Sequence, residues 1–326
     1  MGILAAAMAA TVLLALAADR SSCRCGAALA ARWLRLRRPV APCRGVPNFI
    51  LLSLDGGATR WPWEVAYRRT IVASGARNPN GCRIPMTWFT SCCHGGRQTG
   101  ECGIAQAAYA AGHELATHTM THPDERWLSM SYEELAHEIG GQRSWLVDNC
   151  SVPSSSVRGF RAPGFRTNDA VGRVLADLGF KYDSSHMERS YQQQGGALDA
   201  GFELTLARLD VPHNWSGLPL FEVPAYRLPG GNKRMDPLPA AGMSILQRLR
   251  ADFERKRGSG VPVPILAHIA YLNTPSNRGE VVSFLRWALA QPNTWALTYS
   301  QYVAWLEAGP AVEMTQLLAD HICDRS

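Results

Sequence analysis

The chain has 326 residues, of which 46% are hydrophobic and 18% are charged. This composition is typical of a globular protein, and it excludes an intrinsically disordered chain. The length suits one large α/β barrel or two small domains, and the formal net charge of +6 comes with no nucleic-acid-binding motif.

The chain begins with an uninterrupted apolar run, Ile3 to Ala18, that is rich in Ala and Leu. Small residues come just before Asp19, which is typical of a signal-peptide cleavage site, and the run is short for a membrane-spanning helix. We therefore predict a signal peptide at residues 1–18 and a secreted protein, with a retained anchor as the alternative. No other stretch is long and apolar enough to span a membrane, so no span is expected after cleavage.

Residues 19–46 are predicted to be a poorly ordered leader that carries much of the basic excess (Arg32, Arg35, Arg37, Arg38 and Arg44). The simpler interpretation is a solvated segment. The alternative is a patch that attracts an acidic polymer or a membrane surface. No aromatic residues are interleaved in the way that nucleic-acid binding requires, so no nucleic acid is expected as a partner.

Residues 47–326 are predicted to form a single domain in which strands and helices alternate. We expect strands at 49–54, 84–89, 114–117, 157–160, 220–223, 263–268 and 295–298. We expect helices at 132–147, 169–178, 243–257, 281–289 and 302–306. This alternation indicates parallel βαβ units, and about seven of them in one stretch favour a barrel, whose site lies at the carboxyl ends of the strands.

Nine cysteines favour disulfides and an oxidising compartment (Cys23, Cys25, Cys43, Cys82, Cys92, Cys93, Cys102, Cys150 and Cys323). Their spacing lacks the paired CxxC pattern of structural zinc. An odd number leaves at least one cysteine unpaired within the chain, and the pairing itself stays open. Asn149 and Asn214 begin N-glycosylation sequons, which agree with secretion.

Two histidines four residues apart form the strongest candidate site. His118 and His122 follow the expected strand at 114–117. If the segment turns helically, the two imidazoles lie on one face, which is a metal-ligand spacing. A surface histidine pair is the alternative, but the position just after a strand favours metal binding.

Asp55 stands at the end of the expected strand 49–54, followed by Gly56 and Gly57. It is a candidate general base or metal ligand, and the alternative is an Asp-Gly-Gly turn with no chemical role. Taken alone, the two interpretations are balanced.

Three more polar residues are candidates for the site. Arg161 is a candidate for holding a carboxylate, although it could equally cap a helix or lie in solvent. His268 ends the expected strand 263–268, where a lone histidine is more often a core residue than a catalyst. Asp183 is a weak signal by itself.

Taken in chain order, these residues resemble the five motifs of the NodB-like polysaccharide deacetylases, carbohydrate esterase family four: Asp55, His118 to His122, Arg161-Ala162-Pro163, Asp183-Ser184, and Leu266 with His268. The runs Asn78–Cys82, Thr87–Phe89 and Gly112–Glu114 look like the insect chitin deacetylase branch. The resemblance covers about residues 47–308. It implies a distorted (β/α) barrel and an N-acetylated glycan substrate, such as chitin or peptidoglycan.

The resemblance also implies roles for the motif residues. His118 and His122 would be ligands of a divalent metal, usually zinc. Asp55 would be the general base that takes a proton from water, and His268 would protonate the departing amine.

The remaining motif residues would support these four. Arg161 would hold Asp55, and Asp183 would orient His268. A backbone N–H near Gly164 would help to stabilise the oxyanion, and Leu266 would line the pocket for the acetyl methyl group.

The sequence departs from the family in the first motif. The family has two adjacent aspartates, one a base and one a metal ligand, whereas this chain has Asp55-Gly56. The third ligand is therefore missing, so weaker metal binding and lower activity are expected. Gly164 also stands where the family usually has an aromatic residue.

The preferred hypothesis is a secreted, metal-dependent deacetylase that hydrolyses the N-acetyl groups of a chitin-like polysaccharide, weakened by the change at Gly56. One alternative is an inactive, glycan-binding relative with the same fold. The other is a structural protein of the extracellular matrix that is crosslinked through its unpaired cysteine. The sequence does not indicate the glycan, the metal or the oligomeric state.

Overall fold

The computed structural model describes residues 45–124, 126–187, 202–203, 214–230 and 235–324. The expected signal peptide at 1–18 and nearly all of the expected leader at 19–46 lie outside these residues. So do Cys23, Cys25 and Cys43. Among the described residues, no helix is long and apolar enough to cross a membrane.

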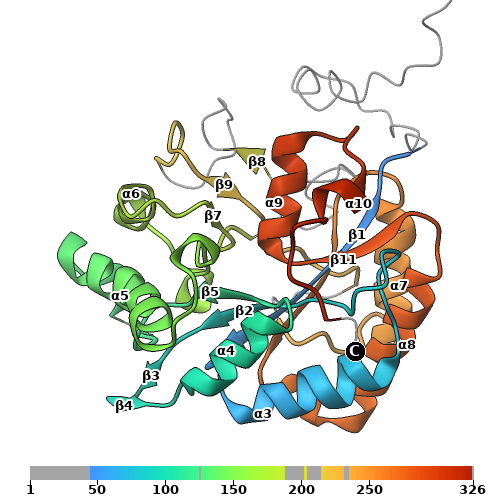
Figure 1. The fold of residues 1–326 in the computed structure, drawn as a ribbon, viewed down its shortest axis with the longest axis horizontal. Coiled ribbons are helices and arrows are strands. Elements are labelled where there is room, and N and C mark those ends of the chain that lie inside the picture. The colour runs from blue at the N-terminus through green and yellow to red at the C-terminus, as the bar shows by residue number, and fades with distance from the viewer. Residues whose placement is uncertain (1–44, 125, 188–201, 204–213, 231–234, 325–326) are drawn as a thin grey trace, which may run out of the picture.

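A largely parallel sheet lies at the centre of the molecule (Figure 1). Its strands are β1 (Asn48–Gly56), β2 (Thr87–Thr90), β5 (Glu114–Thr117), β6 (Gly159–Phe160), β7 (Tyr182–Asp183), β8 (Phe202–Glu203), β9 (Phe221–Glu222), β10 (Val263–His268) and β11 (Thr294–Leu297). They run in the order β10-β1-β2-β5-β6-β7-β9-β8, with β11 also paired to β1. The path does not close within the described part of the chain. The expected α/β barrel class is thus confirmed as an open half-barrel.

Helices surround this sheet, with α5 and α6 on one side and α7 and α8 on the other (Figure 1). The helical segments are α3 (Arg60–Pro62) continuing as the π-helical η1 (Trp63–Val72), α4 (Cys102–Ala110), α5 (Tyr132–Ser144) continuing as the π-helical η3 (Trp145–Asn149), α6 (Asp169–Asp177), α7 (Ile245–Lys256), α8 (Pro275–Leu289), α9 (Tyr299–Ala308) and α10 (Met314–Leu317). Single 3₁₀ turns are η2 (Trp127–Ser129), η4 (Ser154–Ser156), η5 (Pro163–Phe165) and η6 (Tyr271–Asn273). All five expected helices are confirmed. The helices at 60–72 and 102–110 were not expected.

Local capping explains where several helices begin. Ser131, Ser244 and Thr298 each accept a hydrogen bond from the backbone three residues ahead, and each forms a complete capping box at the start of α5, α7 or α9. Pro275 at the first position of α8 sets its start six residues before the expected one.

Alternation along β1 decides which side chains reach the interior of the half-barrel. Ile50 and Leu52 belong to the core between sheet and helices, whereas Phe49 and Leu51 belong to a second core on the other face. Since side chains in a strand alternate between faces, Asp55 continues the face of Phe49 and Leu51. The end of β1 therefore presents a carboxylate inside the curve of the sheet.

Three disulfides join the described cysteines: Cys82–Cys323, Cys102–Cys150 and the adjacent pair Cys92–Cys93. The expectation of disulfides is confirmed. The pair Cys92–Cys93 opens a small hairpin of β3 (Cys93–His94) and β4 (Arg97–Gln98), which no sequence pattern indicated.

Candidate functional site

A buried ion pair joins β1 to the segment after β6. Nη1 of Arg161 lies 2.6 Å from Oδ1 of Asp55, and both side chains are almost fully buried. The same nitrogen donates to Oγ of Ser53 at 3.0 Å, and Nη2 donates to the hydroxyl of Tyr299 at 3.0 Å. The guanidinium carbon lies 3.9 Å from the ring centroid of Phe89. These contacts hold Oδ1 of Asp55 in place.

His118 lies beside the other oxygen of Asp55. Its Nδ1 is 2.7 Å from the carbonyl oxygen of Arg161, which can only accept, so Nδ1 carries the proton. Its Nε2 therefore keeps a lone pair, and this atom lies 3.9 Å from Oδ2 of Asp55. Burial lowers the pKa of His118 to about 4. The imidazole is neutral at pH 7, which is the form that binds metals.

His122 approaches His118 through a tight loop rather than along a helix. Thr119 and His122 have φ angles of 66° and 55°, so the segment does not turn helically. The two imidazole centroids are nevertheless 5.0 Å apart. Nδ1 of His122 lies 2.8 Å from Oδ1 of Asp124, which leaves Nε2 as the nitrogen available to a metal.

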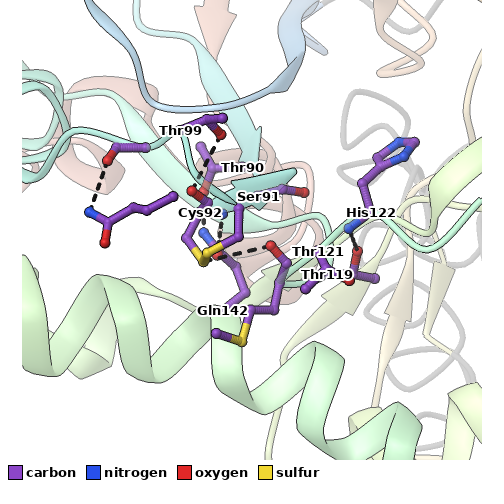
Figure 2. The surroundings of a disulfide bond; sticks show 12 residues. Thr90, Ser91, Cys92, Thr99, Thr119, Thr121, His122 and Gln142 are labelled. Atoms are coloured by element: carbon purple, nitrogen blue, oxygen red, sulfur yellow. Dashed lines mark hydrogen bonds between the residues drawn. A yellow bond between two sulfur atoms is a disulfide. The ribbon is translucent and has the colours of Figure 1, made fainter. Parts of the chain in front are cut away.

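Helix α5 holds this loop against the end of β2. Glu138 accepts from both the backbone N–H and the hydroxyl of Thr121, at 2.9 and 2.7 Å. One turn further on, Gln142 accepts from the N–H of Cys92 at 2.7 Å and donates to the hydroxyl of Thr90 at 2.9 Å. Figure 2 shows Gln142 reaching Thr90 and Cys92, with His122 on the loop beyond Thr121. Glu138 and Gln142, on one face of α5, thus position the loop that carries His122 and the Cys92–Cys93 disulfide.

His268 lies at the end of β10 with 60% of its side chain exposed. Its Nδ1 is 2.7 Å from Oδ2 of Asp236, and its backbone N–H donates to Oδ1 of the same residue at 2.8 Å. In the sheet, His268 is the register partner of Asp55. The acid and base candidates therefore stand on neighbouring strands.

The expected contact between Asp183 and His268 needs correction, because Asp236 is the carboxylate at Nδ1 of His268. Asp183 is buried and accepts from the N–H and the hydroxyl of Ser185, at 2.8 and 2.7 Å. Ser185 in turn accepts from the N–H of Ala162 at 2.8 Å. Burial raises the pKa of Asp183. Through Ser185, Asp183 thus helps to hold the backbone of Ala162, the residue after Arg161.

Gly56 occupies a position that a side chain cannot easily enter. Its φ is +144°, a value that other residues rarely adopt. A Cβ atom there would lie only 2.7 Å from Cγ2 of Ile269. The space that a second aspartate would need is therefore filled by Ile269.

The two remaining motif residues lie at the edges of the site. Gly164 adopts φ 60° in the tight turn after β6, and the ring of the next residue, Phe165, lies 5.5 Å from the guanidinium carbon of Arg161. An aromatic ring thus reaches the site from position 165. Leu266 is buried and lines a small cavity with Tyr226 and Met235.

The donor set fits a divalent metal in part. Two imidazoles that share a tetrahedral zinc, with Zn–N bonds of about 2.0–2.1 Å, have ring centroids about 5 Å apart, as His118 and His122 do. Catalytic zinc sites have three protein ligands. Among the residues that the structure describes, no three His, Cys, Asp or Glu side chains already lie at ligand spacing. The site therefore holds two good ligands and lacks a third in place.

Sequence reasoning missed four residues that shape the site: Asp124, Glu138, Asp236 and Ile269. Asp124 lies two residues after His122, so its closeness to the histidine pair could have signalled it. Asp236 and Ile269 follow no recognisable pattern. In the sequence, nothing distinguishes Glu138 from the other charged residues of an amphipathic helix.

Comparisons with known proteins identify relatives of this chain. Residues 82–182 match the family described as "Polysaccharide deacetylase". The chain is 28% identical over 147 residues to chitin deacetylase 1 of Bombyx mori, covering 44% of this chain and 26% of that protein. It is also 28% identical over 143 residues to chitin deacetylase 8 of Bombyx mori, covering 43% of this chain and 35% of that protein. The matched region is thus about a quarter to a third of these relatives' length.

A solved structure assigned to the polysaccharide deacetylases, from Mycobacterium smegmatis, has a similar fold. Its TM-score is 0.54 at 18% identity, and the match covers 83% of this chain and 95% of that one. At this identity the likeness establishes the fold alone. Together with the family match, it confirms the resemblance that the ordered motifs indicated.

Proposed function

We propose that this chain, which carries a polysaccharide deacetylase domain over residues 82–182, hydrolyses the N-acetyl groups of a chitin-like polysaccharide. The observation that carries the proposal is the arrangement of Asp55, His118, His122 and His268 at the carboxyl ends of β1, β5 and β10. In barrels of parallel strands this edge bears the active site.

Amide hydrolysis needs a base for the attacking water and an acid for the departing amine. Asp55 is suited to the first task, because Arg161 fixes Oδ1 and leaves Oδ2 directed towards His118. His268 is suited to the second, because Asp236 orients its Nδ1 and the ring is exposed to a substrate. Their register across β1 and β10 places the two groups on neighbouring strands.

His118 and His122 would hold a divalent metal such as zinc. When bound, the metal supplies a Lewis acid that polarises the acetamide carbonyl and lowers the pKa of water. The backbone near Gly164 adds an N–H donor for the oxyanion, and Leu266 supplies an apolar wall. The three disulfides support a secreted protein, since such bonds persist in oxidising compartments.

A second candidate function is binding of the same glycan without hydrolysis. The observation that favours it is the state of position 56, where Ile269 fills the space of a third carboxylate ligand. A metal held by two imidazoles alone binds weakly, and such a site could keep its affinity for sugar while losing its chemistry.

The first experiment measures acetate release from chitin oligomers by the full secreted chain, with added zinc and with a chelator. We expect release that the chelator abolishes. His268→Gln should reduce kcat by about 10²- to 10⁴-fold, because it removes the proton donor. Because 60% of the His268 side chain is exposed, we expect this change to cost little stability, and His137→Ala on the exposed face of α5 is the control.

One outcome would reject hydrolysis, and another would reject only the assignment of the acid. If wild type releases no acetate but sediments with insoluble chitin, the binding function stands instead. If His268→Gln keeps full kcat, the proposed acid is another group.

A further inference from the structure

We propose that Trp61 is a stacking platform for a sugar ring of the glycan, beside the unit whose acetamide is hydrolysed. This inference rests on the proposed function, because it names a binding subsite next to the same acid and base candidates. The ligand is a pyranose unit of a β-linked N-acetylglucosamine chain, whose ring faces carry C–H groups that pack against a flat indole. Trp61 belongs to none of the five ordered motifs.

The first ground is the exposure of the indole. Trp61 is 53% exposed, whereas every other tryptophan that the structure describes is buried or half-buried. An exposed indole keeps a large apolar surface in water, and a ligand that packs on it removes that surface from water. Since single exposed apolar residues are common, the way in which this ring is held and its place in the fold decide its role.

The second ground is the fixed position of the ring. Its Nε1–H donates to Oδ1 of Asn273 at 2.6 Å. The carbonyl oxygen of Asn273 accepts from Nη1 of Arg278 at 3.1 Å, and its N–H donates to the Ala270 carbonyl at 3.1 Å, so the acceptor is itself held in place. A ring that is fixed before binding loses little conformational freedom when a ligand packs on it. The polar edge of the indole is thus satisfied by the protein, while much of its apolar surface stays exposed.

The third ground is the place of this bridge in the fold. β1 ends at Gly56 and β10 ends at His268, and Trp61 and Asn273 each lie five residues further along the chain. The bridge therefore joins the segments that follow the two strands bearing Asp55 and His268, which are register partners. Five residues span at most about 18 Å, so the indole lies within reach of a short oligomer bound at the acid and base candidates.

The fourth ground is the anchoring of the loop that carries Trp61. The carbonyl of Ala58 accepts from the N–H of Glu101 at 2.8 Å, and the Glu101 carboxylate accepts from the N–H of Arg60 at 2.9 Å. These hydrogen bonds tie the loop to the segment between β4 and α4. On its other side the indole is tied to the segment after β10. Trp61 is therefore held at the carboxyl edge of the sheet.

This arrangement separates two tasks. Asp55 and His268 act on one acetamide, and Trp61 holds a neighbouring sugar unit of the same chain. The contact is made with the face of the sugar ring and needs no metal, so it holds the glycan in either of the two candidate functions.

The test is the affinity of the full chain for the chitin pentamer, measured by titration calorimetry. All variants carry His268→Gln, so that the oligomer is not consumed during the titration. Trp61→Ala should weaken binding about 10-fold, because the aromatic contact is lost. Asn273→Ala should weaken it less. Asn273→Asp should bind like the parent, because a carboxylate oxygen still accepts from the indole N–H.

Tyr132→Ala is the matched control, and it should leave binding unchanged. Tyr132 is also an exposed aromatic residue with a tethered polar end, but its hydroxyl donates to Asp177 at the end of α6, which precedes β7. Thermal unfolding checks that each variant folds like the parent.

Equal pentamer affinity with and without Trp61 would overturn the inference, as would a parent protein that binds no pentamer. Failure of the proposed function looks different. A chain that releases no acetate but binds the pentamer through Trp61 would retain this subsite and reject the deacetylase.

Discussion

At the scale of single residues, the contact between Gly56 and Ile269 determines whether a third metal ligand can stand at position 56. The sequence shows that position 56 lacks the aspartate ligand. The structure adds that the side chain of Ile269 fills the space that this aspartate would need. Restoring an aspartate therefore meets two barriers, a left-handed φ and a side chain in the way.

We predict that Gly56→Asp alone lowers the free energy of unfolding by about 2 to 6 kcal/mol, since the strained backbone and the overpacking each contribute about 1 to 3 kcal/mol. It should bring no gain in zinc affinity. The double variant Gly56→Asp/Ile269→Ala should regain part of this stability and bind zinc more tightly than wild type. Urea unfolding and chelator competition measure the two effects.

Ile269→Ala alone is the control. It measures the stability that is lost with the packing of Ile269, so that the effect of removing its clash with Asp at position 56 can be separated. Tight zinc binding by Gly56→Asp alone would contradict the prediction and show that Ile269 moves aside readily.

At the scale of elements, α5 is the part of the fold that assembles the site. Glu138 and Gln142, one turn apart, reach the loop of His122 and the start of the hairpin. Residues four apart lie on one helix face, so a single helix aligns both segments. The capping box at Ser131 fixes where this helix begins and hence where those side chains fall.

We predict that Glu138→Ala lowers the free energy of unfolding by about 1 to 3 kcal/mol, because the N–H of Thr121 loses its acceptor. Zinc affinity should fall at the same time, since the loop of His122 is no longer held. Urea unfolding and chelator competition detect both changes. Glu133→Ala, on the exposed face of the same helix, should change neither quantity appreciably, and a zinc affinity unaffected by Glu138→Ala would show that the loop holds itself.

At the scale of the whole molecule, two disulfides join segments that are far apart in the sequence. Cys82–Cys323 spans 241 residues and ties the C-terminal segment to the loop before β2, whereas Cys102–Cys150 spans 48. In the chain-entropy description, a longer closed loop restricts the unfolded chain more.

We predict that Cys82→Ala/Cys323→Ala lowers the free energy of unfolding by more than Cys102→Ala/Cys150→Ala does. Loop entropy alone gives about 5.5 and 4 kcal/mol for the two bridges, so the difference should be about 1 to 2 kcal/mol. Urea unfolding under non-reducing conditions measures both. The reverse order would mean that native packing around Cys102–Cys150 outweighs chain entropy.

The sequence by itself determined the class of the fold and the main elements. Apolar runs of strand length and helices with capping residues are local signals, and each can be recognised without knowledge of the rest of the chain. The expected strand at 84–89 begins instead at Thr87, after Pro85, because proline has no N–H to give to the sheet. The ordered polar residues at strand ends also indicated the family, since that order survives in the linear chain.

Only the tertiary structure decided which polar groups meet. The pairing of His268 with Asp236 joins a strand end to a loop that has no pattern of its own, and it replaces the expected role of Asp183. The closeness of His94 to His122 comes from hydrogen bonds between backbones beyond two strands. Ile269 meets Gly56 because neighbouring parallel strands bring their ends together. Such contacts depend on register and strand order, which join residues far apart in sequence and leave no trace in local composition.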